Sequence, residues 1–210
     1  MVKILNERKL DTIEMRKAYC NALIAAGEKD ERIVAVDCDL SSSMGSRDFY
    51  KRFPERGYDL GIMEQNACGV SAGLSAAGLI PFFHTFAIFA SRRVYDQLFL
   101  SCAYAGLNVK IIGGDAGVSA TYNGGTHMAF EDVGILRCVP HITIVEPSDA
   151  VMLTSLVPQL AENYGVYYMR TPRKPVVKIY EDGSEFPIGK AALLRDGTDI
   201  TIIASGMAVC

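Results

Sequence analysis

Five short, largely apolar runs constrain the fold of this chain more than any other feature. They are IVAVD (33–37), IPFFHTF (80–86), NVKIIGG (108–114), ITIVE (142–146) and VYYMR (166–170). Runs of this length without regular polar alternation are typical of strands buried on both faces. Segments with helical character lie between them, at 12–26, 46–53, 88–105 and 147–163. This alternation predicts an α/β fold, with a doubly wound, mostly parallel sheet and helices on both faces.

The pattern also predicts how the N-terminal part is organised. Residues 1–10 are polar, so we expect them to be peripheral. Asp11 and Glu14 have the spacing of a capping box for the helix over 12–26, and Gly27 is a typical residue to end it.

We place the α/β domain at residues 8–172. From residue 173 the sequence changes to short extended pieces, with turn signals at 182–183 and 196–197. ITIIASGMAVC (200–210) resembles the first strand of another α/β unit. We therefore interpret 173–210 as a linker and the start of a truncated C-terminal α/β domain.

Composition excludes several classes of protein. The net charge is −3 and no basic tract stands out, so nucleic acid is a poor candidate partner. No apolar run is long enough to cross a membrane, and the charged N-terminus is unlike a signal peptide. The six cysteines form no C-x-x-C pair and lie mostly in apolar segments, so we expect a cytoplasmic protein without a metal site of its own.

The most informative stretch is DLGIMEQNACGVSAGLSAAG (59–78), which places one acidic residue, Glu64, before a helix of very small residues. Glycine is unfavourable inside a helix by about 1 kcal/mol, unless close packing against another backbone compensates. Gly69 and Gly73 would give such a helix a smooth face, which favours a homodimer. Glu64 then has two interpretations. It is either a partner of the helix dipole or a carboxylate held at a packed interface to bind a base.

Motifs for other common activities are missing. The chain has neither a G-x-G-x-x-G turn nor a P-loop to hold phosphates, and no G-x-S-x-G nucleophile turn. Two loops remain as candidate ligand sites, CDLSSSMGS (38–46) after a strand and the long Gly- and Ser-rich segment 115–130.

At these positions the sequence resembles the transketolase family. The segments GIMEQNACGVSAGLSAAGLIPFFHTFAIFASRRVYDQL, GGDAGVSATYNGGTHMAFEDVGILRCVP and YMRTPRKP are similar to signatures of its pyrimidine-binding domain. The likeness covers about residues 11–205 and is greatest to the separate C-terminal subunit of a split transketolase. It implies an enzyme that transfers a two-carbon ketol unit between sugar phosphates. It also implies thiamine diphosphate as cofactor, shared with a partner subunit that binds the diphosphate and Mg²⁺.

The resemblance assigns roles to residues around this cofactor. Glu64 would hydrogen-bond N1′ of the aminopyrimidine ring and thereby promote loss of the thiazolium C2 proton, and His127 would assist proton transfer near the substrate hydroxyls. Phe86 would stack on the aminopyrimidine ring. The other residues assigned to the cofactor are Phe83, Phe89, Asp39 and Ile62.

Five further residues match positions that contact a sugar-phosphate substrate: Arg16, Ser43, Arg170, Asn123 and Asp115. Arginine suits a phosphate because its planar fork of donors can bind two oxygens. The sequence departs from the family at Asn123, where an aspartate is usual, and at Asp115, where some transketolases have a second histidine. These departures affect sugar specificity more than cofactor chemistry.

The family's Gly-Asp-Gly…Asn motif for Mg²⁺ and diphosphate is absent. The resemblance therefore implies a complementary subunit, in a homodimer or heterotetramer, without which this chain is inactive. Two alternatives stay open. One is a subunit of a decarboxylating thiamine enzyme, similar to deoxyxylulose-phosphate synthase or to a 2-oxo acid dehydrogenase. The other is a non-catalytic assembly subunit with the same fold.

Overall fold

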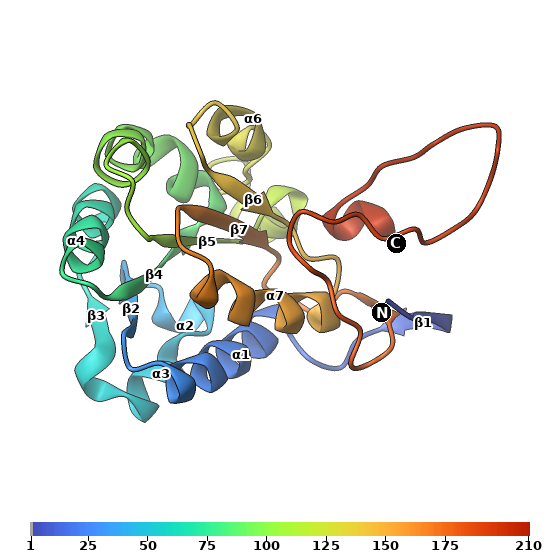
Figure 1. Cartoon of the computed structure of the whole chain (residues 1–210), viewed down its shortest axis with the longest axis horizontal. Helices are drawn as coiled ribbons and strands as arrows, with labels where there is room; N and C mark the ends of the chain where they lie inside the picture. The colour runs from blue at the N-terminus through green and yellow to red at the C-terminus, as the bar shows by residue number, and fades with distance from the viewer. Residues whose placement is uncertain (1) are drawn as a thin grey trace.

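A computed structural model describes residues 2–210 and contains one parallel six-stranded sheet (Figure 1). The strand order is β3-β2-β4-β5-β7-β6, and every neighbouring pair is parallel. The strands are β2 (Ile33–Asp37), β3 (Gly57–Asp59), β4 (Ile80–Phe86), β5 (Lys110–Gly114), β6 (Thr143–Val145) and β7 (Tyr167–Thr171). All five predicted runs are strands, so the predicted α/β fold class is confirmed.

Helices cover both faces of this sheet, because alternate residues of each buried strand point to opposite sides. On one face, α1 (Met15–Lys29) and α7 (Ala150–Glu162) pack on Phe82, Ile112 and Met169. On the other, α4 (Glu64–Ala76) and the helical stretch 89–104 pack on Phe83, Ile111 and Tyr168. The remaining short elements are α2 (Ser41–Met44), α3 (Arg47–Arg52), η1 (Pro54–Arg56), η4 (Gly117–Asn123), α6 (Asp132–Leu136) and η5 (Gly206–Val209).

The predicted helix over 88–105 is present but is not a regular α-helix. Its main parts are the π-helical η2 (Phe89–Arg93) and η3 (Leu98–Tyr104), joined by α5 (Tyr95–Gln97). The wider π-helical turn is common at functional sites, and here it lies beside the N-terminus of α4. Apolar periodicity does not distinguish it from an α-helix.

The prediction for the ends of α1 was wrong. The Asp11 carboxylate accepts from the backbone N–H groups of Thr12 and Ile13, and Glu14 caps without a side-chain bond, so no capping box forms. The helix also continues past Gly27 to Lys29. A Cβ at residue 27 would lie 2.9 Å from the ring of Phe49. Gly27 therefore allows α3 to approach α1, and it does not end the helix.

Residues 1–10 are more structured than predicted. Ile4–Leu10 form β1, which pairs antiparallel with β8 (Val177–Tyr180) in a second, two-stranded sheet. The buried Asp149 carboxylate accepts from the backbone N–H groups of Ile179 and Tyr180 at 2.9 and 3.0 Å and so ties β8 to the start of α7. This pairing links the N-terminal segment to the segment that follows the predicted domain boundary at residue 172.

The predicted strand near the C-terminus does not form in this chain. Residues 200–205 have no strand, and the side chains of Ile200, Ile202 and Ile203 are exposed. An apolar strand needs neighbours on its edges, and the red C-terminal segment in Figure 1 projects away from the sheet. Of the predicted turns, the one at 182–183 is present and the one at 196–197 is not.

The small-residue face of α4 is exposed. A Cβ at Gly69 or Gly73 would meet no atom within 4 Å, so within residues 2–210 no other backbone packs closely on this face. Among the residues that the structure describes, no helix has the length and apolar character needed to cross a membrane.

Candidate active site

The predicted catalytic carboxylate lies at the first position of α4. Glu64 is 2% exposed, and its two oxygens have different partners. Thr85 Oγ1, from the end of β4, donates to Oε1 at 3.3 Å, and Arg93 Nη1 donates to Oε2 at 2.8 Å. Glu64 thus lies where the dipole of α4 stabilises its charge, which fits the first interpretation from the sequence, while binding of a base stays a prediction.

Aromatic side chains lie next to this carboxylate. The Arg93 guanidinium stacks on Phe89, 3.8 Å from the ring centroid, and Phe89 lies 6.2 Å from Phe86. The imidazole of His127 contacts both rings edge-on, with centroid distances of 5.7 Å to Phe86 and 5.3 Å to Phe89. Residues from β4, η2 and the 115–130 loop therefore form one cluster, and Arg93 connects this cluster to Glu64.

Phe83 does not belong to the surface of this cluster. It precedes Phe86 on β4, and its ring is fully buried between the sheet and α4. Side chains along a strand alternate between its two faces. Phe83 and Phe86 are three positions apart on β4, so they point to opposite faces of the sheet. The structure gives Phe83 a packing position, without exposed area for a ligand.

Asp39 and Ile62 lie exposed at the carboxyl ends of β2 and β3. A residue that the sequence analysis missed, Asp59, links their loops. Its Oδ1 accepts from the backbone N–H of Asp39 at 2.8 Å and from that of Gly61 at 3.1 Å. Asn123 is also exposed, at the end of η4, while His127 is partly buried.

Three of the predicted substrate residues line one narrow pocket. Arg16 reaches it from α1, Ser43 from α2 and Asp115 from the end of β5. Another charged residue, Arg173, lines it as well and donates to the two oxygens of Asp115 from Nε and Nη2. Arg173 lies in the YMRTPRKP segment, where the sequence analysis assigned a role only to Arg170.

A larger open depression lies on the outer side of Arg16. Its lining includes Thr12, Glu14, Lys17, Arg47 and Asp48, but none of the other predicted site residues. The size of a depression therefore does not identify the active site in this chain. We assign the site from the positions of the predicted catalytic and binding residues.

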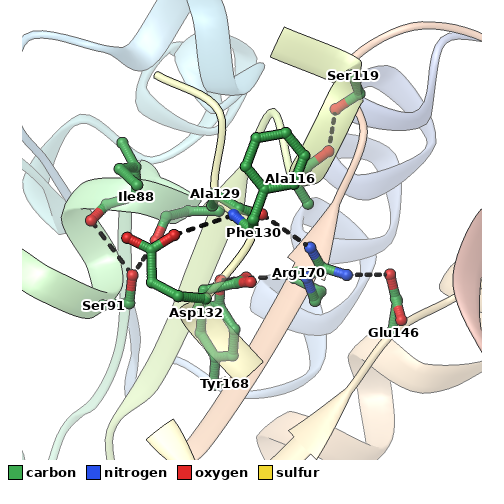
Figure 2. A network of polar contacts seen from close by, with 12 residues as sticks. Ile88, Ser91, Ala116, Ser119, Ala129, Phe130, Asp132, Glu146, Tyr168 and Arg170 are labelled. Carbon is green, nitrogen blue, oxygen red and sulfur yellow. Dashed lines mark hydrogen bonds and ion pairs between the residues drawn. The ribbon is translucent and has the colours of Figure 1, made fainter. Parts of the chain in front are cut away.

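Arg170 is held away from the narrow pocket. Figure 2 shows its guanidinium between Asp132 and Glu146. Nε donates to Asp132 Oδ2 at 2.8 Å and Nη1 to Glu146 Oε1 at 2.5 Å, while Nη2 donates to the Ala129 carbonyl at 3.3 Å. Burial opposes its charge, but Glu146 and Asp132 raise the pKa of Arg170 above its ordinary value. With two carboxylates on one guanidinium, this cluster is net negative and does not favour a phosphate.

Comparison with known proteins identifies the fold. A family model described as "Transketolase, pyrimidine binding domain" matches residues 11–177. The chain belongs to the transketolase family. Enzymes of this family depend on thiamine diphosphate, and the matched part is the domain that binds the pyrimidine ring.

The relatives include subunits of split transketolases. The chain is 48% identical over 203 residues to the 6-deoxy-6-sulfo-D-fructose transketolase subunit of Clostridium sp. (strain MSTE9), covering 97% of this chain and 63% of that protein. It is 41% identical to a putative transketolase C-terminal section from Methanocaldococcus jannaschii, covering 91% of this chain and 61% of that protein. The chain thus spans about three fifths of the length of these curated relatives.

A solved structure agrees with this placement. The model superimposes with a TM-score of 0.84 on a split-gene transketolase described as an inactive β4 tetramer, with 39% sequence identity. The match covers 94% of this chain and 64% of that one.

Proposed function

We propose that this chain is the pyrimidine-binding part of a two-subunit transketolase. The enzyme would transfer a two-carbon ketol unit between sugar phosphates, or between sugars with a comparable terminal anion. The observation that carries the proposal is the buried Glu64 carboxylate beside the cluster of Phe86, Phe89 and His127. The names of two relatives, a sulfofructose transketolase subunit and an apulose-4-phosphate transketolase subunit, support the general reaction and differ in the sugar.

The residues present fit the ring of thiamine diphosphate. When bound, this cofactor supplies the electron sink that carbon–carbon bond cleavage needs. Glu64 offers a buried carboxylate oxygen to hold a proton at N1′, and Phe86 and Phe89 offer apolar faces that exclude water from it. Arg93 donates to Glu64 Oε2 and Thr85 donates to Oε1, so a ring nitrogen would share one of these oxygens with the donor already present.

The residues present do not fit the Mg²⁺ ion. Within the described range 2–210, no group of three or more His, Cys, Asp or Glu side chains could hold a metal ion. A complementary subunit would therefore supply the Mg²⁺ and diphosphate site. The exposed glycine face of α4 fits further association into a homodimer or heterotetramer.

On the substrate side, His127 would exchange protons with the sugar hydroxyls, and Arg16 and Ser43 would bind the terminal anion. Asp39 and Ile62, at the same edge, stay proposed as cofactor contacts, and Asn123 as a substrate contact. The six cysteines are all free, which fits the reducing cytoplasm as the site of action.

The test is reconstitution with the complementary subunit, thiamine diphosphate and Mg²⁺. Glu64→Gln should lower ketol transfer by about 10²–10⁴-fold, because the amide cannot accept or return the N1′ proton. The same variant should slow deuterium exchange at the cofactor C2 position, followed by NMR. Glu55→Gln, an exposed control on η1, should leave both measurements unchanged.

Two outcomes would contradict the proposal. Full activity of Glu64→Gln would remove the catalytic role of the carboxylate and favour a non-catalytic assembly subunit. Release of CO₂ from a 2-oxo acid, without ketol transfer, would identify a decarboxylating thiamine enzyme instead.

A further inference from the structure

We propose that Arg173 determines the specificity of the substrate pocket. Together with Arg16 and Asp115 it would give the pocket one net positive charge and so favour a sugar whose terminal group is a monoanion, such as a sulfonate. This inference rests on the proposed function and specifies its substrate class.

Arg173 is rigidly positioned at the pocket. It lies two residues after the end of β7, and its carbonyl accepts from the backbone N–H of Arg16 at 3.3 Å. Its guanidinium binds Asp115 in a bidentate pair and lies 5.4 Å from the centroid of the Phe86 ring. Arg173 therefore joins the start of α1, the end of β5 and the aromatic cluster beside Glu64.

Asp115 is held as firmly as its partner. Its side chain is 5% exposed, and its backbone has φ of 54°, in the left-handed region that residues other than glycine rarely adopt. Strain of this kind is found at functional sites, where the surrounding structure keeps a side chain in place. The carboxylate thus stays in the pocket, opposite Arg16.

The charges around the pocket can be counted from their contacts. Only Arg16, Asp115 and Arg173 are charged among the residues that line it. Just outside, Glu14 is shared between Arg16 Nε at 2.7 Å and Lys174 Nζ at 3.1 Å, and hydrogen bonds from Arg16 and then Lys174 lower its pKa, so it is ionised at neutral pH. Three cations face two carboxylates, which leaves one net positive charge.

Arg170 does not change this balance. Its guanidinium is bound by Asp132 and Glu146, and that group carries a net negative charge. The second arginine that the sequence analysis assigned to the substrate is therefore replaced at the pocket by Arg173.

One net positive charge has a consequence for selectivity. A sulfonate neutralises it, whereas a phosphate dianion leaves an excess negative charge next to Asp115. A neutral hydroxyl leaves the positive charge unpaired. A phosphate monoester becomes a monoanion below its second pKa of about 6, so its disadvantage should disappear in acid.

The experiment uses the reconstituted two-subunit enzyme and three acceptors. These are three-carbon 2-hydroxyaldehydes that carry a sulfonate, a phosphate or a hydroxyl group on C3. At pH 7.5 the wild type should show a kcat/KM about tenfold higher for the sulfonate than for the phosphate, equivalent to about 1.4 kcal/mol. Below pH 6 the ratio of the two values should approach one.

Two variants and a control test the residues. Arg173→Met should lower kcat/KM for both anionic acceptors by about 10–100-fold, while the value for the hydroxyl acceptor changes less than about twofold. Arg173→Lys should recover part of the loss. Asp115→Asn should raise the phosphate-to-sulfonate ratio about tenfold at pH 7.5 and flatten its pH dependence. Arg52→Met, an exposed control on α3, should leave all three values unchanged.

The outcomes separate this inference from the proposed function. The ratio of the kcat/KM values for two acceptors does not depend on the concentration of active enzyme. The ratio measured for Asp115→Asn therefore tests the inference even if Arg173→Met folds poorly. A wild type that prefers phosphate above pH 6, or an Arg173→Met variant that loses the same factor for all acceptors, would overturn the inference while ketol transfer stands. Failure of the wild type with every acceptor would overturn the proposed function, and the inference with it.

Discussion

Replacing Arg170 by methionine should strongly destabilise the fold, because it leaves a buried carboxylate without its counter-ion. Asp132, on α6, is fully buried, and its Oδ2 accepts from Arg170 Nε at 2.8 Å and from the Tyr168 hydroxyl at 2.7 Å. Its other oxygen, Oδ1, is buried without a hydrogen-bond partner. Among the residues that the structure describes, Arg170 is therefore the only cation that pairs with this carboxylate, as Figure 2 illustrates.

The magnitude follows from burial. Removing one partner of a buried ion pair costs about 3–5 kcal/mol, because the remaining charge stays desolvated. The side chains of Arg170 and Asp132 are 14% and 1% exposed, so the upper part of that range applies to Asp132. Glu146, at 21%, can be hydrated and should add little. For a chain of this size about 1 kcal/mol shifts the Tm by about 2–4 °C, so a loss of about 4–5 kcal/mol should lower the Tm by about 8–20 °C.

Urea unfolding at pH 7, followed by circular dichroism, measures this effect. Two controls bracket it. Tyr168→Phe removes a single hydrogen bond to the same oxygen and should cost about 0.5–1.5 kcal/mol. Arg52→Met breaks an exposed ion pair with Glu28 and should cost about 0–1 kcal/mol.

A loss below about 1.5 kcal/mol for Arg170→Met would refute the reasoning, since it would mean that Asp132 does not need the guanidinium. Arg170 would then be free to bind a substrate anion, as the sequence resemblance implied. A large loss would support a structural position for Arg170 and leave the anion to Arg16 and Arg173.

Two further predictions concern buried and exposed positions elsewhere. Burial lowers the pKa of Lys110 to about 7, so the unfolded state binds more protons than the fold between pH 7 and about 10, and wild-type stability should rise across that window. Lys110→Met should abolish this rise in urea titrations, and parallel pH profiles of the two proteins would contradict it. Gly73→Arg should keep the thermal stability of the isolated chain, because a side chain there meets open space, but should reduce self-association measured by light scattering. Unchanged assembly would exclude this face of α4 as an interface.

The strands of the main sheet were predictable because burial on both faces forces an apolar run. IVAVD and IPFFHTF were predicted to the residue as β2 and β4. The small antiparallel sheet was not predictable, since β1 is polar and its partner β8 is far away in the sequence. Its stability comes from hydrogen bonds across that separation and from Asp149, neither of which leaves a local pattern.

The candidate site shows the same division. The sequence resemblance identified Glu64, Phe86 and His127, and the structure brings them into one cluster. It also singled out two arginines for the substrate, and only Arg16 lines the pocket. Arg170 and Arg173 lie three residues apart around the end of β7, and which of them faces the pocket depends on the carboxylates that each one meets.

The sequence by itself determined the fold class, the order of most elements and the family, because these follow from local hydrophobic pattern and from motifs. Only the tertiary structure decided that Thr85 and Arg93 both donate to the Glu64 carboxylate and that Phe83 is buried in the core. It also decided that Arg173 and Asp115 line the same pocket. The net charge of a site is the sum of charged groups that come from separate strands and helices. These groups become neighbours only when the chain folds and the sheet brings the ends of its strands together.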